Sequence, residues 1–300
     1  MRQETLILSG HRFNVLVAGE AGQPLMLFLH GFPEYSAAYE DLMPHLAEEF
    51  LCVAPDQRGF GASWKPQNVK DYVLPALLSD AAEVIAHYSS DRTAVVVGHD
   101  WGSAVAYGLA FRFPELVSHL VIANGVHPGP FQRAMAAGGR QTEASQYISD
   151  LRAEGKEHEL VRDEHAAIFD IFNKHMDMGW MTPARRDAYR KAWGDVDGVR
   201  AMLNWYRASP LKLAKPGEPI PPEDLPDLPK EALRVSMPHL LIWGMNDSAL
   251  LPESYEGLEA YCDDLTIEEI ENADHWILHQ RAADVAARIR RFLEARPVVQ

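Results

Sequence analysis

Short apolar runs alternate with amphipathic stretches over the first 123 residues of the chain. Several runs are apolar without interruption, which indicates strands that are buried on both faces of a parallel sheet. The predicted strands are Thr5–Leu8, Phe13–Ala18, Leu25–Leu29, Leu51–Ala54, Val95–Val97 and Leu116–Ala123. Helical spacing of apolar residues predicts helices at Asp41–Glu49, at Leu77–His87 and from Ala104 to about Phe113. This alternation favours an α/β fold with a covered, mostly parallel sheet.

The pattern changes from about residue 124 to residue 235, where no long apolar run occurs. The predicted helices there are Tyr147–Glu154, Glu159–His175, Pro183–Ala192 and Val199–Tyr206, and a proline-rich loop runs from Pro216 to Pro229. Strand patterns return at His239–Trp243 and Leu265–Ile270, with helices near Glu253–Tyr261 and at Ala282–Arg290. We therefore expect an α/β core, residues 1–124 and 236–300, interrupted by a helical cap at residues 125–235.

The sequence Gly-His-Asp-Trp-Gly at residues 98–102 follows the apolar strand Val95–Val97 and precedes a helix. This order is that of a nucleophile elbow, normally Gly-x-Ser-x-Gly, with Asp100 at the serine position. The turn is strained, so the residues two positions before and after the nucleophile must lack bulk. The N-terminus of the following helix would stabilise the carboxylate. The alternative, an ordinary helix N-cap at Asp100, is less favoured by this frame.

A carboxylate at the elbow changes the chemistry. A serine alkoxide attacks an acyl carbon, whereas a carboxylate attacks best at a tetrahedral carbon with a strained or good leaving group. Such an attack forms an alkyl ester on the enzyme, and epoxides and alkyl halides are suitable substrates. Esterase or peptidase activity through Asp100 would require an anhydride, and we do not expect it.

The base and its orienting acid should follow later strands, because the C-terminal ends of parallel strands meet at one edge of the sheet. Asp247 follows the strand His239–Trp243, and His275 follows the strand Leu265–Ile270. Asp100, Asp247 and His275 therefore have the nucleophile–acid–base order of this fold. Taken alone, Asp247 would be an ordinary turn residue.

Three other residues compete for these two roles. Asp274 is less suited than Asp247, because a residue rarely directs its side chain at the ring of its own sequence neighbour. His279 is predicted to lie one turn into the helix after His275. Asn124 follows the strand Leu116–Ala123 but carries no charge.

Backbone N–H groups near the nucleophile are expected to form an oxyanion hole. The N–H of Trp101 follows the nucleophile, and the N–H of Phe32 lies in the loop after the third strand. The bond between Phe32 and Pro33 is a candidate cis peptide, which would turn that N–H inward. His30 and His99 flank this site and are expected to be hydrogen-bonded scaffold residues.

Composition limits the partners of the chain. The formal net charge is -15 with a pI near 5.3, which disfavours nucleic acid and an anionic membrane surface as partners. Cys52 and Cys262 are the only cysteines, so a reducing compartment and a cytoplasmic location are expected. We see no signal peptide and no apolar window that could span a bilayer. No metal cluster or phosphate-binding glycine loop occurs, so we expect no cofactor and no metal.

Over nearly its full length the chain resembles the soluble epoxide hydrolases of the α/β-hydrolase fold. The matching motifs are His30-Gly31-Phe32-Pro33-Glu34, residues 56–63, residues 98–102, Met202-Leu203-Asn204-Trp205-Tyr206-Arg207, Asp247 and His275-Trp276. The resemblance implies a mostly parallel core, a helical cap and an active site between them. It also implies that two cap tyrosines, Tyr147 and Tyr206, bind the epoxide oxygen, with Phe32 and Trp101 beside them in the substrate site.

The chain departs from this family pattern in two places. Asp274 stands where glycine is commoner, and Asp150 and Glu154 follow Tyr147 in place of a more apolar, proline-containing run. The apolar cap residues Phe169, Phe172, Met176, Met178 and Trp180 could line a pocket, but we expect most of them to pack the cap onto the core.

Two other functions stay open. A dehalogenase would share the same nucleophile and base, but a leaving halide needs N–H donors and no proton. Haloalkane dehalogenases favour Asn or Trp where this chain has Phe32, and fluoroacetate dehalogenases favour arginines where it has Trp101 and Ser103. A non-catalytic receptor for a small ligand is less favoured, because a binding protein needs no strained nucleophile.

The expected reactants are a small apolar epoxide and water. Asp100 attacks the epoxide, and Tyr206 and Tyr147 donate hydrogen bonds to the leaving oxygen and supply its proton. His275, oriented by Asp247, activates the water that hydrolyses the ester. With an ordinary histidine pKa near 6.5, activity should fall as the pH drops through that value. The sequence identifies neither the natural epoxide nor the oligomeric state, and a homodimer stays open.

Overall fold

The computed structural model describes residues 1–89, 93–174 and 176–297 of the chain. Within these residues, eight strands form one sheet with the order β1-β2-β4-β3-β5-β6-β7-β8. Strand β2 pairs antiparallel with β1 and β4, and the other neighbours run parallel, which confirms the predicted α/β fold. The strands are β1 (Arg2–Leu8), β2 (His11–Ala18), β3 (Leu25–Leu29), β4 (Leu51–Pro55), β5 (Ala94–His99), β6 (Val117–Ala123), β7 (His239–Gly244) and β8 (Leu265–Ile270).

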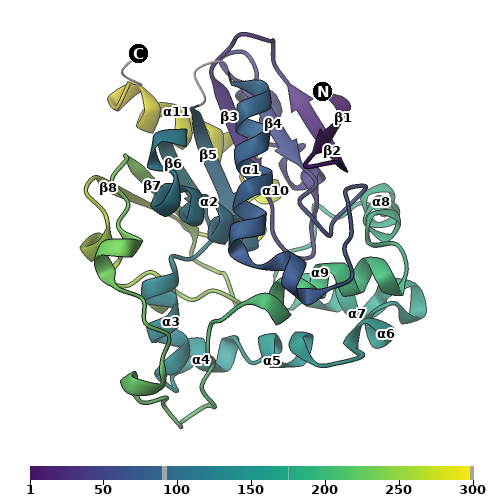
Figure 1. Ribbon diagram of the computed structural model, residues 1–300, viewed down its shortest axis with the longest axis vertical. Coiled ribbons are helices and arrows are strands. Elements are labelled where there is room, and N and C mark those ends of the chain that lie inside the picture. The colour runs from purple at the N-terminus through teal and green to yellow at the C-terminus, as the bar shows by residue number, and fades with distance from the viewer. Residues whose placement is uncertain (90–92, 175, 298–300) are drawn as a thin grey trace.

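Apolar side chains form a packed layer on each face of the sheet. Every residue of β3 and β5 is buried, as their apolar patterns predict. Helices α1 (Leu74–Tyr88) and α2 (Trp101–Arg112) cover one face, and α11 (Ala282–Ala295) covers the other (Figure 1). Full burial of one large apolar side chain contributes about 1.5–3 kcal/mol. These two layers therefore hold the ends of the parallel strands in fixed positions.

The chain between β6 and β7 is helical and lies at one end of the sheet, below it in Figure 1. Its helices are α3 (Pro128–Ala136), α4 (Arg140–Ala144), α5 (Tyr147–Arg152), α6 (Lys156–Leu160), α7 (Arg162–Asn173), α8 (Pro183–Trp193) and α9 (Val196–Ala208). This inserted segment (residues 125–235) ends in the proline-rich loop that the sequence predicts, with a short 3-10 helix at Pro222–Asp224.

Two predicted helices are wrong. Asp41–Glu49 forms only the 3-10 helix Met43–His45, because Pro44 has no N–H to continue an α-helix. Glu253–Tyr261 forms two short 3-10 helices, and Gly257 between them has a φ of +80°, which breaks the helical path.

Other elements differ from the prediction in their bounds. The predicted helix Glu159–His175 is divided between α6 and α7, and its last residue lies outside the described residues. The apolar spacing also does not predict α3, α4 or α10 (Ile277–Gln280), which are short or begin with proline. In the part of the chain that the structure describes, no helix has the length and apolar character needed to cross a membrane.

Candidate active site

Asp100 lies on the turn between β5 and α2, with φ +49° and ψ −123°. Residues other than glycine rarely adopt this backbone conformation, which costs on the order of 1–3 kcal/mol. Close packing of strand and helix requires the flanking glycines. A Cβ at Gly98 would lie 2.9 Å from the carbonyl oxygen of Gly102, and a Cβ at Gly102 would collide with the carbonyl of Leu29. The turn thus has the geometry of the predicted nucleophile elbow.

Backbone donors hold the carboxylate of Asp100. The N–H of Phe32, in the loop after β3, donates to Oδ1 at 2.7 Å, and the N–H of Trp101 donates to the same side chain. These are the two N–H groups that the sequence predicts for an oxyanion hole. The bond between Phe32 and Pro33 is cis, as predicted. A Cβ at Gly31 would overlap the carboxylate, so this loop needs glycine there.

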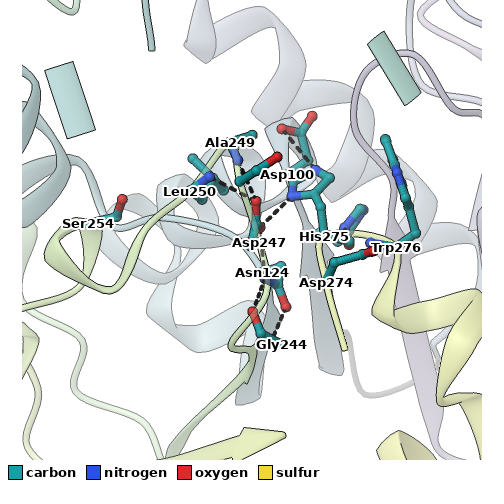
Figure 2. Close-up of polar contacts among 12 residues, drawn as sticks. Asp100, Asn124, Gly244, Asp247, Ala249, Leu250, Ser254, Asp274, His275 and Trp276 are labelled. Carbon is teal, nitrogen blue, oxygen red and sulfur yellow. Dashed lines mark hydrogen bonds and ion pairs between the residues drawn. The ribbon is translucent and has the colours of Figure 1, made fainter. Parts of the chain in front are cut away.

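His275 and Asp247 lie together at the ends of β8 and β7. The Nδ1 atom of His275 lies 2.7 Å from Oδ2 of Asp247, which also accepts a hydrogen bond from Asn124 at 2.8 Å. The other carboxylate oxygen accepts the N–H groups of Ala249 and Leu250 at 2.8 and 2.9 Å. Figure 2 shows the carboxylate between these donors and the imidazole. Asp247 is therefore fixed from several sides and directs the ring of His275 toward Asp100.

Three buried ionisable groups set the electrostatics of this site. Burial raises the pKa of Asp100 to about 6, although His275 and the two backbone N–H groups oppose this rise. Burial alone lowers the pKa of His275, but the charges of Asp247 and Asp100 outweigh it and raise that pKa to about 9. Burial raises the pKa of Asp247, and His275 reverses this effect, so the carboxyl stays ionised. The expected histidine pKa near 6.5 is therefore wrong, because two carboxylates face one ring.

The residues that compete with this pair have other partners. The carboxylate of Asp274 accepts the N–H groups of Trp276 at 2.9 Å and Asp177 at 2.7 Å, so it does not orient His275. His279 lies on α10 and pairs with Glu34 and Asp41 at 2.8 and 3.0 Å.

His30 and His99 are buried scaffold residues, as expected. Nε2 of His30 accepts the N–H of Gln57 at 3.0 Å, and Nε2 of His99 donates to the carbonyl of His275 at 2.8 Å.

Two tyrosines of the inserted segment stand beside the nucleophile. Tyr147 begins α5 and Tyr206 lies near the end of α9, with their ring centroids 6.4 Å apart. The ring of Tyr206 packs edge-on against Phe32 and Trp101, at 5.2 and 5.0 Å between centroids. Burial and the charge of Asp100 raise the pKa of both phenols above the ordinary value, so both stay protonated and can donate hydrogen bonds.

Two cavities meet at the nucleophile, because Asp100, Tyr147 and Tyr206 line both of them. The first has a volume of 240 Å³ and is mostly apolar. Its other walls include Trp101, Val126, Phe131, Leu211, Leu233 and Leu250. The second has a volume of 260 Å³ and extends past His275 and Met176 to Lys174. A ligand that reacts at Asp100 can therefore extend to either side of the carboxylate.

Most of the apolar residues considered for the pocket pack instead, as expected. Phe169 and Phe172 are buried in the core, Met178 packs against it, and Trp180 stacks on His279 at 3.7 Å between centroids. Of these candidates, only Met176 lines one of the two cavities at the nucleophile.

Sequence reasoning missed two polar residues at this site. Glu34 is 1% exposed, accepts a hydrogen bond from Tyr189 at 2.7 Å, and lies 3.5 Å from Nδ1 of His99. Its place in the matching motif is the signal that could have found it. Asn124 was weighed only as an acid, whereas the structure uses its amide to hold Asp247. Among the described residues, no group of three or more His, Cys, Asp or Glu is arranged to hold a metal ion.

Comparisons with known proteins agree with this arrangement. Residues 24–282 match the alpha/beta hydrolase fold family. A solved structure from work on novel epoxide hydrolases of the alpha/beta hydrolases superfamily in metagenomes from hot environments is 34% identical, with a TM-score of 0.88 and 98% of each chain covered. An epoxide hydrolase of Bacillus megaterium, solved with an inhibitor, is 28% identical, with a TM-score of 0.85 over 97% of this chain and 100% of that one. Epoxide hydrolase 1 of Caenorhabditis elegans is 29% identical over 94% of this chain and 68% of that protein.

Proposed function

Because the chain belongs to the alpha/beta hydrolase fold family, and within it to the epoxide hydrolases, we propose that it converts an epoxide to a vicinal diol through an ester on Asp100. The observation that carries this mechanism is a carboxylate at the elbow that faces two phenols on one side and a His–Asp pair on the other. The inserted segment serves as the cap of this site.

In the first step, the carboxylate of Asp100 attacks one epoxide carbon and the C–O bond of the ring breaks. Tyr147 and Tyr206 donate hydrogen bonds to the leaving oxygen, and one of them supplies its proton. The products are an alkyl ester on Asp100 and a neighbouring hydroxyl. The high pKa of both phenols supports this role, because the donors are fully protonated before the reaction.

In the second step, His275 removes a proton from water, and the water attacks the ester carbonyl carbon of Asp100. The N–H groups of Phe32 and Trp101 stabilise the tetrahedral anion. The anion collapses with cleavage of its bond to the alkyl oxygen, protonated His275 gives its proton to that oxygen, and the diol leaves. The proton that remains on Asp100 returns to the tyrosinate formed in the first step. Formation of the ester also favours the form of His275 that acts as a base. The charge of Asp100 helps to raise the pKa of His275, so its loss in the ester lowers that pKa and favours the neutral ring.

A single turnover with excess enzyme in heavy-oxygen water tests this scheme. The first diol released should carry no label, because its new oxygen comes from Asp100, and the label should enter the carboxylate of Asp100. Direct attack of water on the epoxide would instead label the first diol and leave Asp100 unlabelled. That second result would refute the ester.

The paired phenols favour an epoxide over a halide, because only the alkoxide needs a proton. Phe32 also places no side-chain N–H donor at the site where haloalkane dehalogenases are expected to have one. The apolar character of the first cavity supports a small apolar epoxide as the substrate. We further propose a cytoplasmic location, because both cysteines are free thiols.

A further inference from the structure

The two helices that carry the tyrosines end beside each other. Tyr147 begins α5, which ends at Arg152, and Tyr206 lies two residues before Ala208, the last residue of α9. The last carbonyls of a helix have no partner within it and form the negative end of its dipole. Positive charges placed between two such ends therefore stabilise them.

Each helix supplies an arginine to the end of the other. Nε of Arg152 donates to the carbonyl of Tyr206 at 2.9 Å, and its Nη2 donates to the carbonyls of Ser209 and Leu211 at 3.3 and 3.0 Å. In the opposite direction, Nη2 of Arg207 donates to the carbonyl of Ala153, directly after α5, at 2.8 Å.

A buried carboxylate holds the second arginine. Glu157 is 5% exposed, and its Oε2 lies 2.7 Å from Nη2 of Arg207. Its other oxygen pairs with Arg200 at 2.8 Å. Arg200 also contacts the side chains of Asp197 and Gln67. Among the described residues, Arg200 bonds side chains and makes no hydrogen bond to a backbone carbonyl at either helix end.

We propose that Arg152 and Arg207 are positioning residues that exchange C-terminal caps between α5 and α9 and thereby fix the two tyrosines at one spacing over Asp100. The proposal rests on the proposed function, since the spacing matters because both phenols bind one oxygen. The planar guanidinium of Arg152 bonds the carbonyls of Tyr206, Ser209 and Leu211 from two of its nitrogens, whereas the ammonium of a lysine concentrates its donors on one atom and lacks this fixed fork. Neither arginine lines the cavities at Asp100, so each acts through the tyrosines.

Separate rates for the two chemical steps distinguish a positioning role of the arginines from a general effect on the stability of the fold. The tyrosines act only when the epoxide opens, whereas His275 and Asp247 stand on loops of the core and act in ester hydrolysis. Arg152→Met should slow formation of the ester by roughly 10- to 100-fold, because displacing a catalytic group by about 1 Å costs up to about 100-fold. Hydrolysis of the ester should stay within about twofold of wild type. Arg207→Met should likewise slow formation of the ester and leave its hydrolysis nearly unchanged.

Stopped-flow quenching of tryptophan fluorescence with styrene oxide can measure both steps, since Trp101 and Trp205 line the first cavity. Arg200→Met is the matched control, because it removes an ion pair to the same Glu157 but no contact to a helix-end carbonyl. It should leave both rates unchanged. Arg152→Lys keeps the charge and should give an intermediate rate of ester formation, and it replaces Arg152→Met if that variant does not fold.

Equal slowing of both steps, or the same loss in Arg200→Met, would overturn the proposal, as would a normal rate of ester formation in both Arg152 variants. Fluorotyrosine NMR gives a second readout that does not depend on turnover. The resonances of Tyr147 and Tyr206 should move in Arg152→Met and stay in place in Arg200→Met, and unmoved resonances in Arg152→Met would also overturn it. If wild type forms no ester, the proposed function fails. The comparison of the tyrosine resonances between Arg152→Met and Arg200→Met then still tests the role of Arg152.

Discussion

Nε2 of His275 lies 3.8 Å from Oδ2 of Asp100, which is too long for a hydrogen bond but close enough for strong interaction between the charges. The imidazole is instead bonded through its other nitrogen to Asp247. In our mechanism, this leaves Nε2 free to take a proton from a water molecule that attacks the ester on Asp100. The two residues thus affect each other's pKa while they act in different steps.

This relationship predicts that the two steps depend differently on pH. Attack on the epoxide needs ionised Asp100, whose pKa is raised to about 6, so kcat/KM should fall as the pH drops below about that value. Ester hydrolysis needs neutral His275. Its rate should rise with pH through a pKa that lies below the value of about 9 in the free enzyme, because the ester carries no charge. Single-turnover rates across the pH range measure both limbs. The assignment would be contradicted if the rates of the two steps changed with pH in the same way, or if the rate of ester hydrolysis rose only above about pH 9.

Removal of either phenol should slow the opening of the epoxide. Tyr206→Phe and Tyr147→Phe each remove one hydrogen bond to the leaving oxygen, and loss of one such donor typically costs roughly 100- to 1000-fold. Rapid-quench measurement of ester formation should show this loss, with little change in ester hydrolysis. Tyr189→Phe is a suitable control, because Tyr189 is a buried tyrosine of the same segment that bonds Glu34 and lines neither cavity at Asp100. If the two variants instead slowed only the hydrolysis of the ester, the tyrosines would act in the second step, and this mechanism would be contradicted.

Two buried histidines beside Tyr107 of α2 should make the fold sensitive to acid. Burial lowers the pKa of His239 to about 3 and that of His127 to about 4. Both rings stay neutral in the folded state, whereas an unfolded histidine takes up a proton below about pH 6.5. The free energy of unfolding should therefore decrease from about pH 6.5 down to about pH 4 for His127 and about pH 3 for His239, by a few kcal/mol in total.

Urea unfolding of wild type and His239→Gln at about pH 7 and about pH 4.5 tests this effect. The side chain of His239 bonds Tyr107 and the carbonyl of Leu120, and glutamine can keep polar contacts there without titrating. The variant should lose less stability between the two pH values than wild type does. An equal loss in both proteins would show that this ring is not responsible.

Sequence reasoning reached the parts of the site that local pattern determines. The elbow requires glycines at fixed positions around Asp100, and the positions of Asp247 and His275 follow from the strands that precede them. Contacts between distant residues left no such signal. The amide of Asn124 on Asp247 and the exchange of arginines between α5 and α9 depend on how helices and strands pack. The pKa of His275 was missed for the same reason, since it depends on two carboxylates that lie far apart in the sequence.

The ester on Asp100 is the central claim, and trapping it is the most direct test. In His275→Gln, the first step keeps its nucleophile and its phenols, but the base for the second step is absent. Mixing this variant with styrene oxide should raise the mass of the intact protein by one substrate molecule, and peptide mapping should place the addition on Asp100. Unmodified protein together with undiminished diol release, or an addition on any other residue, would contradict the account.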